Sequence, residues 1–200
     1  MISIIDYGLG NVLAFRNVYE RLNIPVSVAR TPADLAKSTK LILPGVGAFD
    51  HAMERLEASG MRGPIEELVL QQKVPVLGIC VGMQMLAASS EEGKKKGLSW
   101  VGGTVRKFRG PGLAVPHMGW NDVKPASAAR LFVGMENNAR FYFLHSYYFV
   151  CPDPTDVLAV CDYGGGFSCA VNRGNIFGVQ FHPEKSHHWG GLLLKNFAEL

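Results

Sequence analysis

The stretch that most constrains the fold is Val74–Leu86, in which an apolar strand-type run passes directly into an apolar segment of helical spacing. Gly78 and Gly82 lie two residues before and two residues after Cys80. A side chain at either position would obstruct a sharp strand-to-helix turn. The pattern predicts a nucleophile elbow that presents Cys80 above a sheet edge, at a helix N-terminus that favours its thiolate. The alternative is a buried structural cysteine in a βα turn.

The composition is typical of one globular domain in a reducing compartment. Of the 200 residues, 48% are hydrophobic and 18% are charged, which suits a full hydrophobic core that needs no disulfide bonds or metal ions to stabilise it. The four cysteines show neither CxxC nor zinc-type spacing, and we find no signal peptide and no apolar run of membrane-helix length. The net charge of +3 argues neither for nor against nucleic acid, and no other feature points to it. We expect a single cytoplasmic domain over residues 1–200, with no membrane or nucleic-acid partner.

The first half of the chain alternates strand-type and helix-type segments. Strand patterns occupy residues 1–6, 25–29, 41–43 and the run before Cys80, and the helical patterns between them lie at 12–22, from 32, at 50–59 and at 64–72. Such β-α alternation predicts an α/β fold, with an open and mostly parallel sheet and helices on both faces.

After Ser90 the strand-type pieces become short and are interrupted by Gly and Pro. They lie at 103–108, 121–124, 140–144, 147–151 and 157–161. Because no flexible linker separates the two halves, we expect an antiparallel β extension of the same domain. Two further strand patterns, 168–172 and 176–181, flank Arg173-Gly174-Asn175, and this turn-rich connection predicts a hairpin.

A glycine-rich loop follows the strand pattern at 41–43. Backbone N–H groups at the carboxyl end of a strand can point into the crevice where open α/β sheets bind ligands. We therefore hypothesise that Gly45, Val46 and Gly47 provide part of an oxyanion hole, with the N–H of Val81 as the other donor. The alternative is a loop that only needs a positive φ.

A histidine and a glutamate follow the last strand pattern. His182 and Glu184 are two residues apart, so in extended chain their side chains share a face. His182 can then take the proton of Cys80 while Glu184 holds its tautomer and orientation. A lone histidine at a strand end is more often a satisfied surface residue, but the cysteine elbow upstream favours catalysis. His187 and His188 have no acidic or cysteine partners at ligand spacing, so we expect no metal and no cofactor.

Residues 78–84, followed far downstream by 182–184, resemble the signature of the triad-type (class I) glutamine amidotransferases. Residues 6–11, 44–49, 116–121 and 182–186 extend the resemblance over nearly the whole chain, toward the free-standing glutaminase subunits that serve a histidine-pathway synthase. Two departures are local. Related glutaminases usually have Pro-Gly-Gly where this chain has Pro44-Gly45-Val46-Gly47, and leucine is more usual than Val81 after the cysteine.

The resemblance implies a reaction. Cys80 attacks the side-chain amide of glutamine, and His182 hands a proton to the leaving ammonia. A glutamyl thioester is then hydrolysed, with Glu184 orienting His182. The residues implied to hold glutamine are Gly45, Gln84, Ser146 and Tyr147.

The resemblance also implies a heterodimer. Free ammonia would be protonated in bulk water and lose its nucleophilicity, so the family passes it through a tunnel to a (β/α)8 synthase subunit. Our candidates for the partner-facing surface are Asn11, Trp120, Tyr142, Lys185 and Lys195. Ordinary packing and solvation are the alternative explanation for these side chains.

Three other functions compete with this one. The chain could be a glutaminase subunit of another synthase, for anthranilate, pyridoxal phosphate or aminodeoxychorismate. It could be a cysteine peptidase or hydrolase of similar fold, or a non-catalytic partner-binding subunit. The presence of Cys80, His182 and Glu184 argues against the non-catalytic subunit.

Overall fold

The computed structural model describes residues 1–126, 129–135 and 139–200. Its strands are β1 (Ile2–Ile5), β2 (Val26–Ala29), β3 (Lys40–Gly45), β4 (Val76–Cys80), β5 (Ser89–Ser90), β6 (Thr104–Lys107), β7 (His117–Asp122), β8 (Lys124–Pro125), β9 (Arg140–His145), β10 (Tyr147–Val150), β11 (Val157–Asp162), β12 (Gly166–Arg173) and β13 (Ile176–Val179). Its helices are α1 (Val12–Arg21), η1 (Pro32–Lys37), α2 (Phe49–Ala58), α3 (Arg62–Glu66), η2 (Glu67–Gln71), α4 (Val81–Gln84), η3 (Arg130–Phe132), η4 (Pro154–Asp156), η5 (Pro183–Lys185) and α5 (His187–Glu199).

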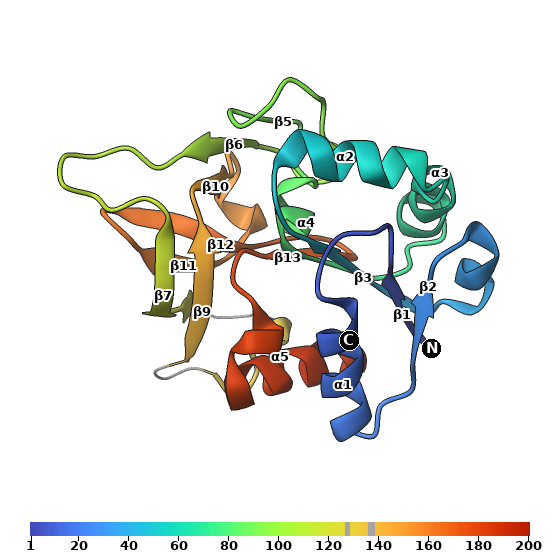
Figure 1. Cartoon of the computed structure of the whole chain (residues 1–200). Helices are drawn as coiled ribbons and strands as arrows, with labels where there is room; N and C mark the ends of the chain where they lie inside the picture. The colour runs from blue at the N-terminus through green and yellow to red at the C-terminus, as the bar shows by residue number, and fades with distance from the viewer. Residues whose placement is uncertain (127–128, 136–138) are drawn as a thin grey trace.

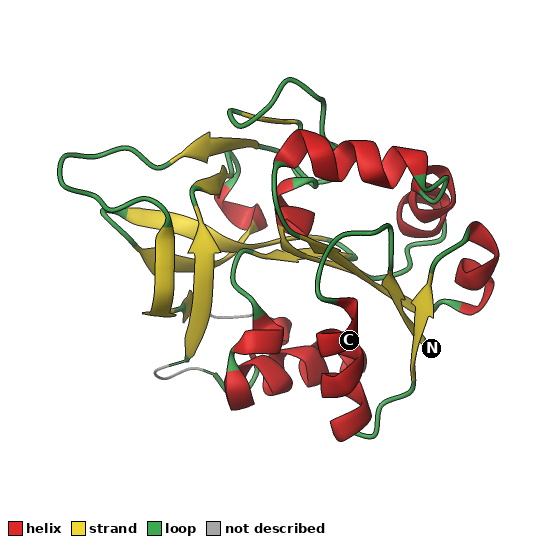
Figure 2. Cartoon of the chain, in the orientation of Figure 1, coloured by secondary structure: helices red, strands yellow, loops and turns green. Residues whose placement is uncertain are grey.

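The centre of the molecule is a parallel sheet with the strand order β2-β1-β3-β4-β13. Strands β1, β4 and β13 are buried along their whole length, as expected for strands covered on both faces. Helices α1 and α5 cover one face, and α2, α3 and α4 cover the other (Figures 1 and 2). The α/β fold with helices on both faces is therefore confirmed.

The β extension continues the same sheet beyond β13. Strands β12, β10 and β6 follow in antiparallel order, and β11 pairs with β12. Strands β12 and β13 form the predicted hairpin, in which Arg173 lies opposite Ile176. One part differs from the prediction, because β7 and β9 form a separate two-stranded ribbon beside the extension (Figure 1).

Strand β7 was misplaced and helix α5 was missed by the sequence patterns. The strand expected at 121–124 begins earlier, at His117, and ends at Asp122. Its inward-facing residues include His117, Gly119 and Asn121, which give no apolar alternation to detect. The 13-residue helix α5 was not predicted, and it contains adjacent glycines, which lower helix propensity.

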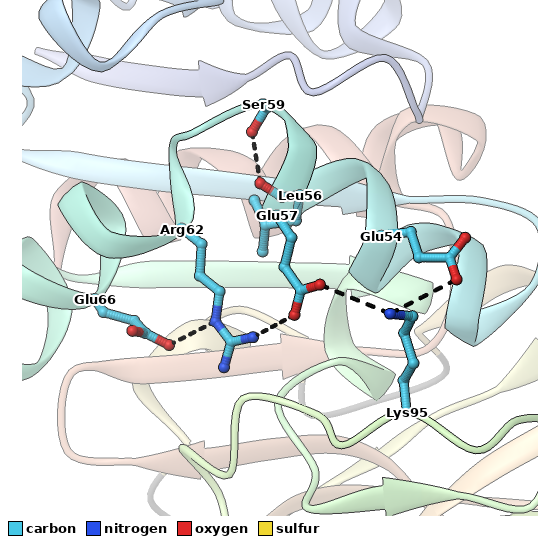
Figure 3. Close-up of polar contacts among 7 residues, drawn as sticks. All are labelled: Glu54, Leu56, Glu57, Ser59, Arg62, Glu66 and Lys95. Atoms are coloured by element: carbon cyan, nitrogen blue, oxygen red, sulfur yellow. Dashed lines mark hydrogen bonds and ion pairs between the residues drawn. The ribbon is translucent and has the colours of Figure 1, made fainter.

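The surface loop at residues 92–95 is held against the start of α2 by hydrogen bonds. The carboxylate of Asp50 accepts hydrogen bonds from the backbone N–H groups of Lys94 and Lys95, each at 2.9 Å, and Glu92 Oε2 accepts one from the N–H of Phe49 at 2.8 Å. Lys95 also bridges two glutamates of α2, and Arg62 ties α2 to α3 (Figure 3). Such partly exposed ion pairs each contribute only about 0–1 kcal/mol. Together these contacts fix the loop beside the chain segment that follows Gly47.

Candidate active site

Cys80 lies at the junction of β4 and α4 in a conformation that L-residues rarely adopt. Its φ is 56° and its ψ is −113°, and its side chain is buried. A Cβ on Gly78 would lie 2.6 Å from the Gly82 carbonyl oxygen, and one on Gly82 would overlap the Leu43 carbonyl oxygen. The two glycines are therefore required by close backbone approach, as the elbow pattern predicts. Helix α4 is a single turn, so its dipole at Cys80 is weaker than the sequence pattern suggests.

The glycine-rich loop packs directly against this elbow. In the parallel pairing of β3 and β4, Gly45 lies opposite Cys80. A Cβ on Gly45 would overlap the backbone nitrogen of Gly82 and lie 2.8 Å from the carbonyl carbon of Val81. Gly47 has a φ of +83°, so this loop does need a positive φ. That need does not exclude a role for its N–H groups.

His182 reaches the elbow because β13 runs parallel to β4. Val179 lies opposite Ile79, so the carboxyl ends of both strands meet at one edge of the sheet. The Nδ1 atom of His182 lies 2.9 Å from Oε1 of Glu184, and both side chains are at most 6% exposed. One detail of the prediction is wrong. Strand β13 ends at Val179, and Glu184 meets the imidazole through the 3-10 turn η5 instead of through extended chain.

The pKa of His182 is raised to about 10. Burial alone lowers the pKa, but hydrogen bonds and charge interactions with Cys80 and Glu184 outweigh it. The imidazole is therefore protonated at neutral pH and donates from Nδ1 to Glu184. The Nε2 atom is then left for exchange of a proton with Cys80.

A pocket of about 340 Å³ opens over Cys80 and His182. Its wall contains the predicted site residues Val46, Gly47, Val81, Gln84, Ser146 and Tyr147. Gly45 and Glu184 stand behind this wall, Gly45 against the elbow and Glu184 against His182. Five more side chains line the pocket, of which only Lys185 was selected from the sequence: Glu92, Pro116, Leu144, His145 and Lys185.

Comparison with known proteins decides the family. The family model "Glutamine amidotransferase class-I" matches residues 3–199. The chain belongs to the class I glutamine amidotransferases. The "Imidazole glycerol phosphate synthase subunit HisH" of Bdellovibrio bacteriovorus is 63% identical, and that of Leptospira interrogans is 54% identical, each with 100% of both chains covered.

Solved structures agree on the fold of this amidotransferase. A crystal structure named "glutamine amidotransferase" has a TM-score of 0.76 at 19% identity and covers 99% of this chain and 97% of its own. The structure of PurLQS from Thermotoga maritima has a TM-score of 0.75 at 17% identity, again with 99% of this chain and 97% of its own chain covered. At these identities the likeness concerns the fold alone.

Gln84 of the amidotransferase is buried and already hydrogen-bonded. Its Nε2 donates to the Tyr147 carbonyl oxygen at 3.1 Å and to Gln180 Oε1 at 3.0 Å. The Nε2 of Gln180 contacts Cys80 Sγ at 3.8 Å. Sequence reasoning missed Gln180, although a glutamine at the end of an apolar strand pattern is a usable signal.

Three of the five candidate partner-facing residues form one cluster. The rings of Trp120 and Tyr142 are 6.1 Å apart, and Lys185 Nζ lies 5.8 Å from the centre of the Tyr142 ring. Trp120 and Lys185 are exposed, whereas Tyr142 is half-buried. Asn11 caps α1 by accepting from the N–H of Ala14, and Lys195 pairs with Glu199 along α5. Asn11 and Lys195 are exposed too, but each has a local structural role.

Metal-binding and membrane-spanning features are missing from the described part of the chain. Within residues 1–126, 129–135 and 139–200, no three His, Cys, Asp or Glu side chains are grouped to hold a metal ion. None of the helices described there has the length and apolarity to cross a bilayer.

Proposed function

We propose that this chain is the glutaminase subunit of imidazole glycerol phosphate synthase, which releases ammonia from glutamine and passes it to a (β/α)8 synthase subunit. The observation that carries the glutaminase chemistry is the strained Cys80 beside the buried His182–Glu184 pair at the floor of a pocket. The names of its full-length relatives support the pathway. The single-domain organisation of residues 1–200 and a cytoplasmic location belong to the same proposal.

The proposed reaction uses Cys80, His182 and Glu184 as a triad. Cys80 Sγ attacks the side-chain carbonyl carbon of glutamine, and the amide nitrogen leaves as ammonia with a proton from His182 Nε2. His182 then takes a proton from water, whose oxygen attacks the thioester, and the products are glutamate and free Cys80. Glu184 keeps the proton of Nδ1 in place throughout, which fixes the tautomer and orientation of His182.

The charge that develops on the carbonyl oxygen needs backbone donors. We assign this role to the N–H groups of Val46, Gly47 and Val81, because the glycine-rich loop and the start of α4 both border the pocket next to Cys80. The loss of one such donor typically costs about 10²–10³ in rate.

The pocket also offers both charges that a free amino acid needs. The Glu92 carboxylate suits the α-ammonium group of glutamine, and the Lys185 ammonium suits its α-carboxylate. Gln84, Ser146 and Tyr147 line the same wall, and Gly45 supports it from behind. A peptide substrate lacks at least one of the two free charges, so this pairing favours glutamine over a peptide.

The outer face of the β7–β9 ribbon is the proposed docking surface for the synthase subunit. Met118, Trp120 and Leu144 expose 65%, 42% and 39% of their surface there, and Met118 lies opposite Leu144 in the ribbon. Leu144 also lines the pocket, so a partner seated on this face would cover the path by which ammonia leaves. Tyr142, Lys185, Asn11 and Lys195 are the remaining candidate contacts.

The test is glutamate release by the purified chain, alone and with a histidine-pathway synthase subunit that carries its ribotide. Wild type and Cys80→Ala are compared under both conditions. We expect partner-dependent turnover that the variant loses by at least about 10³-fold, since the nucleophile is removed. Turnover that ignores this synthase would overturn the pathway and retain the glutaminase. An absence of turnover in both mixtures would favour the non-catalytic subunit.

A further inference from the structure

A directional chain of hydrogen bonds runs along the pocket wall, between the β7–β9 ribbon and the nucleophile. Its core is a pair of buried histidines, His117 and His145, which lie opposite each other on the inner face of the ribbon. Their nearest ring nitrogens, His117 Nδ1 and His145 Nε2, are 3.0 Å apart.

The two ends of the chain decide where each proton lies. The Tyr147 carbonyl oxygen can only accept, so His145 Nδ1, at 2.7 Å, must donate. The side-chain N–H of Asn121 can only donate, so His117 Nε2, at 3.2 Å, must accept. His117 Nδ1 therefore donates to His145 Nε2. Both imidazoles are neutral and carry their proton on Nδ1.

The Tyr147 carbonyl joins this pair to the active site. It accepts a second hydrogen bond from Gln84, which also bonds Gln180, the side chain in contact with Cys80 Sγ. Ser146 forms the turn between β9 and β10, Tyr147 is the first residue of β10, and both residues line the pocket. The position of this turn is therefore set from two sides, by Gln84 and by His145.

Aromatic packing holds the pair in place and keeps it neutral. The His117 ring stacks on the rings of Tyr163 and Phe143, with ring centroids 3.9 Å and 4.7 Å apart, and Phe167 lies edge-on to His117. Burial lowers the pKa of His117 to about 4. Burial also lowers the pKa of His145 to about 3, and it outweighs the hydrogen bond to the Tyr147 carbonyl, which raises that pKa. Near neutral pH neither imidazole titrates, so the donor and the acceptor of each hydrogen bond in the pair stay the same.

We propose that His117 and His145 are positioning residues for glutamine: the pair holds the Tyr147 carbonyl, and with it the Ser146–Tyr147 wall of the pocket, in register with Gln84 and Cys80. This inference rests on the proposed glutaminase function. It makes the inner face of the ribbon part of the substrate site, directly behind the outer face that carries Met118 and Trp120.

Three variants separate this role from packing. In His145→Asn, the side-chain N–H₂ takes the place of Nδ1 and keeps the donor to Tyr147, whereas His145→Phe keeps a ring and loses the donor. Phe167→Leu disturbs the same aromatic cluster without removing any hydrogen bond of the chain. The kinetics of glutamate release are measured at about pH 7.5 for each variant and for wild type, where both imidazoles stay neutral.

We expect His145→Phe to raise KM for glutamine about tenfold with a smaller effect on kcat, because a buried carbonyl loses its donor at the pocket wall. His145→Asn should stay within about threefold of wild type, and Phe167→Leu should lower the melting temperature with KM unchanged. Equal KM increases in His145→Phe and His145→Asn would overturn the proposal. An inactive wild type would instead refute the proposed function.

A second measurement does not depend on activity. In ¹⁵N-edited NMR of the histidine rings, both imidazoles should show the proton on Nδ1 and should not titrate between about pH 6 and 8. A proton on Nε2 of His145 would break the chain at the Tyr147 carbonyl and would contradict the proposal. In the His117→Phe variant the ring signals of His117 disappear, which distinguishes them from those of His145.

Discussion

At the scale of single residues, the site depends on histidines in opposite electrostatic environments. His182 meets Cys80 and Glu184, whose hydrogen bonds and charge interactions outweigh its burial, so its pKa is raised to about 10. His117 and His145 meet neutral hydrogen-bond partners and aromatic rings, so burial decides and lowers their pKa values. One side chain is therefore suited to carry the catalytic proton, and the other two to remain neutral.

These shifts predict acid lability. In the unfolded chain His117 and His145 are protonated near pH 6.5, whereas in the folded state they are protonated only at about pH 4 and pH 3. The unfolded state therefore binds more protons as the pH falls below 6.5, and the free energy of unfolding decreases. We expect the free energy of unfolding to drop by roughly 2–4 kcal/mol between about pH 7 and pH 5, at about 1.4 kcal/mol per pKa unit. Urea unfolding at the two pH values measures it.

The control for this prediction is His117→Phe, which keeps the stacking on Phe143 and Tyr163 but removes one titrating group. Its loss of stability over the same pH interval should be about half that of wild type. The raised pKa of His182 acts in the opposite direction, because its contribution is complete below pH 6.5 and is lost progressively as the pH rises from there through about 10. Wild type and His117→Phe share this effect, so the comparison between them retains the contribution of His117. A wild type with equal stability at both pH values would contradict the assignment.

At the scale of elements, the elbow could be predicted and the neighbour that completes it could not. Gly78, Cys80 and Gly82 carry a local steric requirement, which a sequence pattern contains. The place of β13 beside β4 follows from long-range pairing, and no local pattern encodes it. The inner face of β7 was missed for the same kind of reason, since His117 and Asn121 are polar and find hydrogen-bond partners in β9 and β11, which lie far along the chain.

Helix α5 provides the next prediction, because its adjacent glycines have different surroundings. A Cβ on Gly190 would overlap the carbonyl oxygen of Pro183, in the turn that carries Glu184, whereas a Cβ on Gly191 would meet nothing within 4 Å. Gly190→Ala should cost roughly 1–3 kcal/mol by overpacking and should lower kcat by displacing Glu184. Gly191→Ala should add about 0.5–1 kcal/mol, since alanine is the better helix former. Thermal unfolding and glutamate release test both; equal effects would show that α5 does not press on the turn.

At the scale of the whole molecule, the sheet gathers all the proposed functions at one edge. The carboxyl ends of β3, β4 and β13 bring the glycine-rich loop, Cys80 and His182 together. The ribbon stands next to them, with buried histidines on one face and exposed apolar side chains on the other. A partner that covers the ribbon would therefore close the pocket at the same time.

This arrangement makes the docking surface testable with a matched pair of variants. Met118 is 65% exposed on the ribbon, and Val133 is 60% exposed near the far end of α5, where its carbonyl accepts a hydrogen bond from Asn196. Trp120 stacks on His187 at the first residue of α5, so the two positions are separated by most of that helix. Each change to lysine places a charge on an exposed apolar site of similar accessibility.

Met118→Lys should weaken binding to the synthase subunit by at least about tenfold, because a lysine buried in an apolar interface loses its hydration without gaining a partner. Val133→Lys should bind as wild type does. Isothermal titration with the synthase subunit measures both, and circular dichroism checks that each variant keeps the fold. If Met118→Lys binds normally while Val133→Lys does not, the partner contacts the far end of α5, and the ribbon does not form the docking surface.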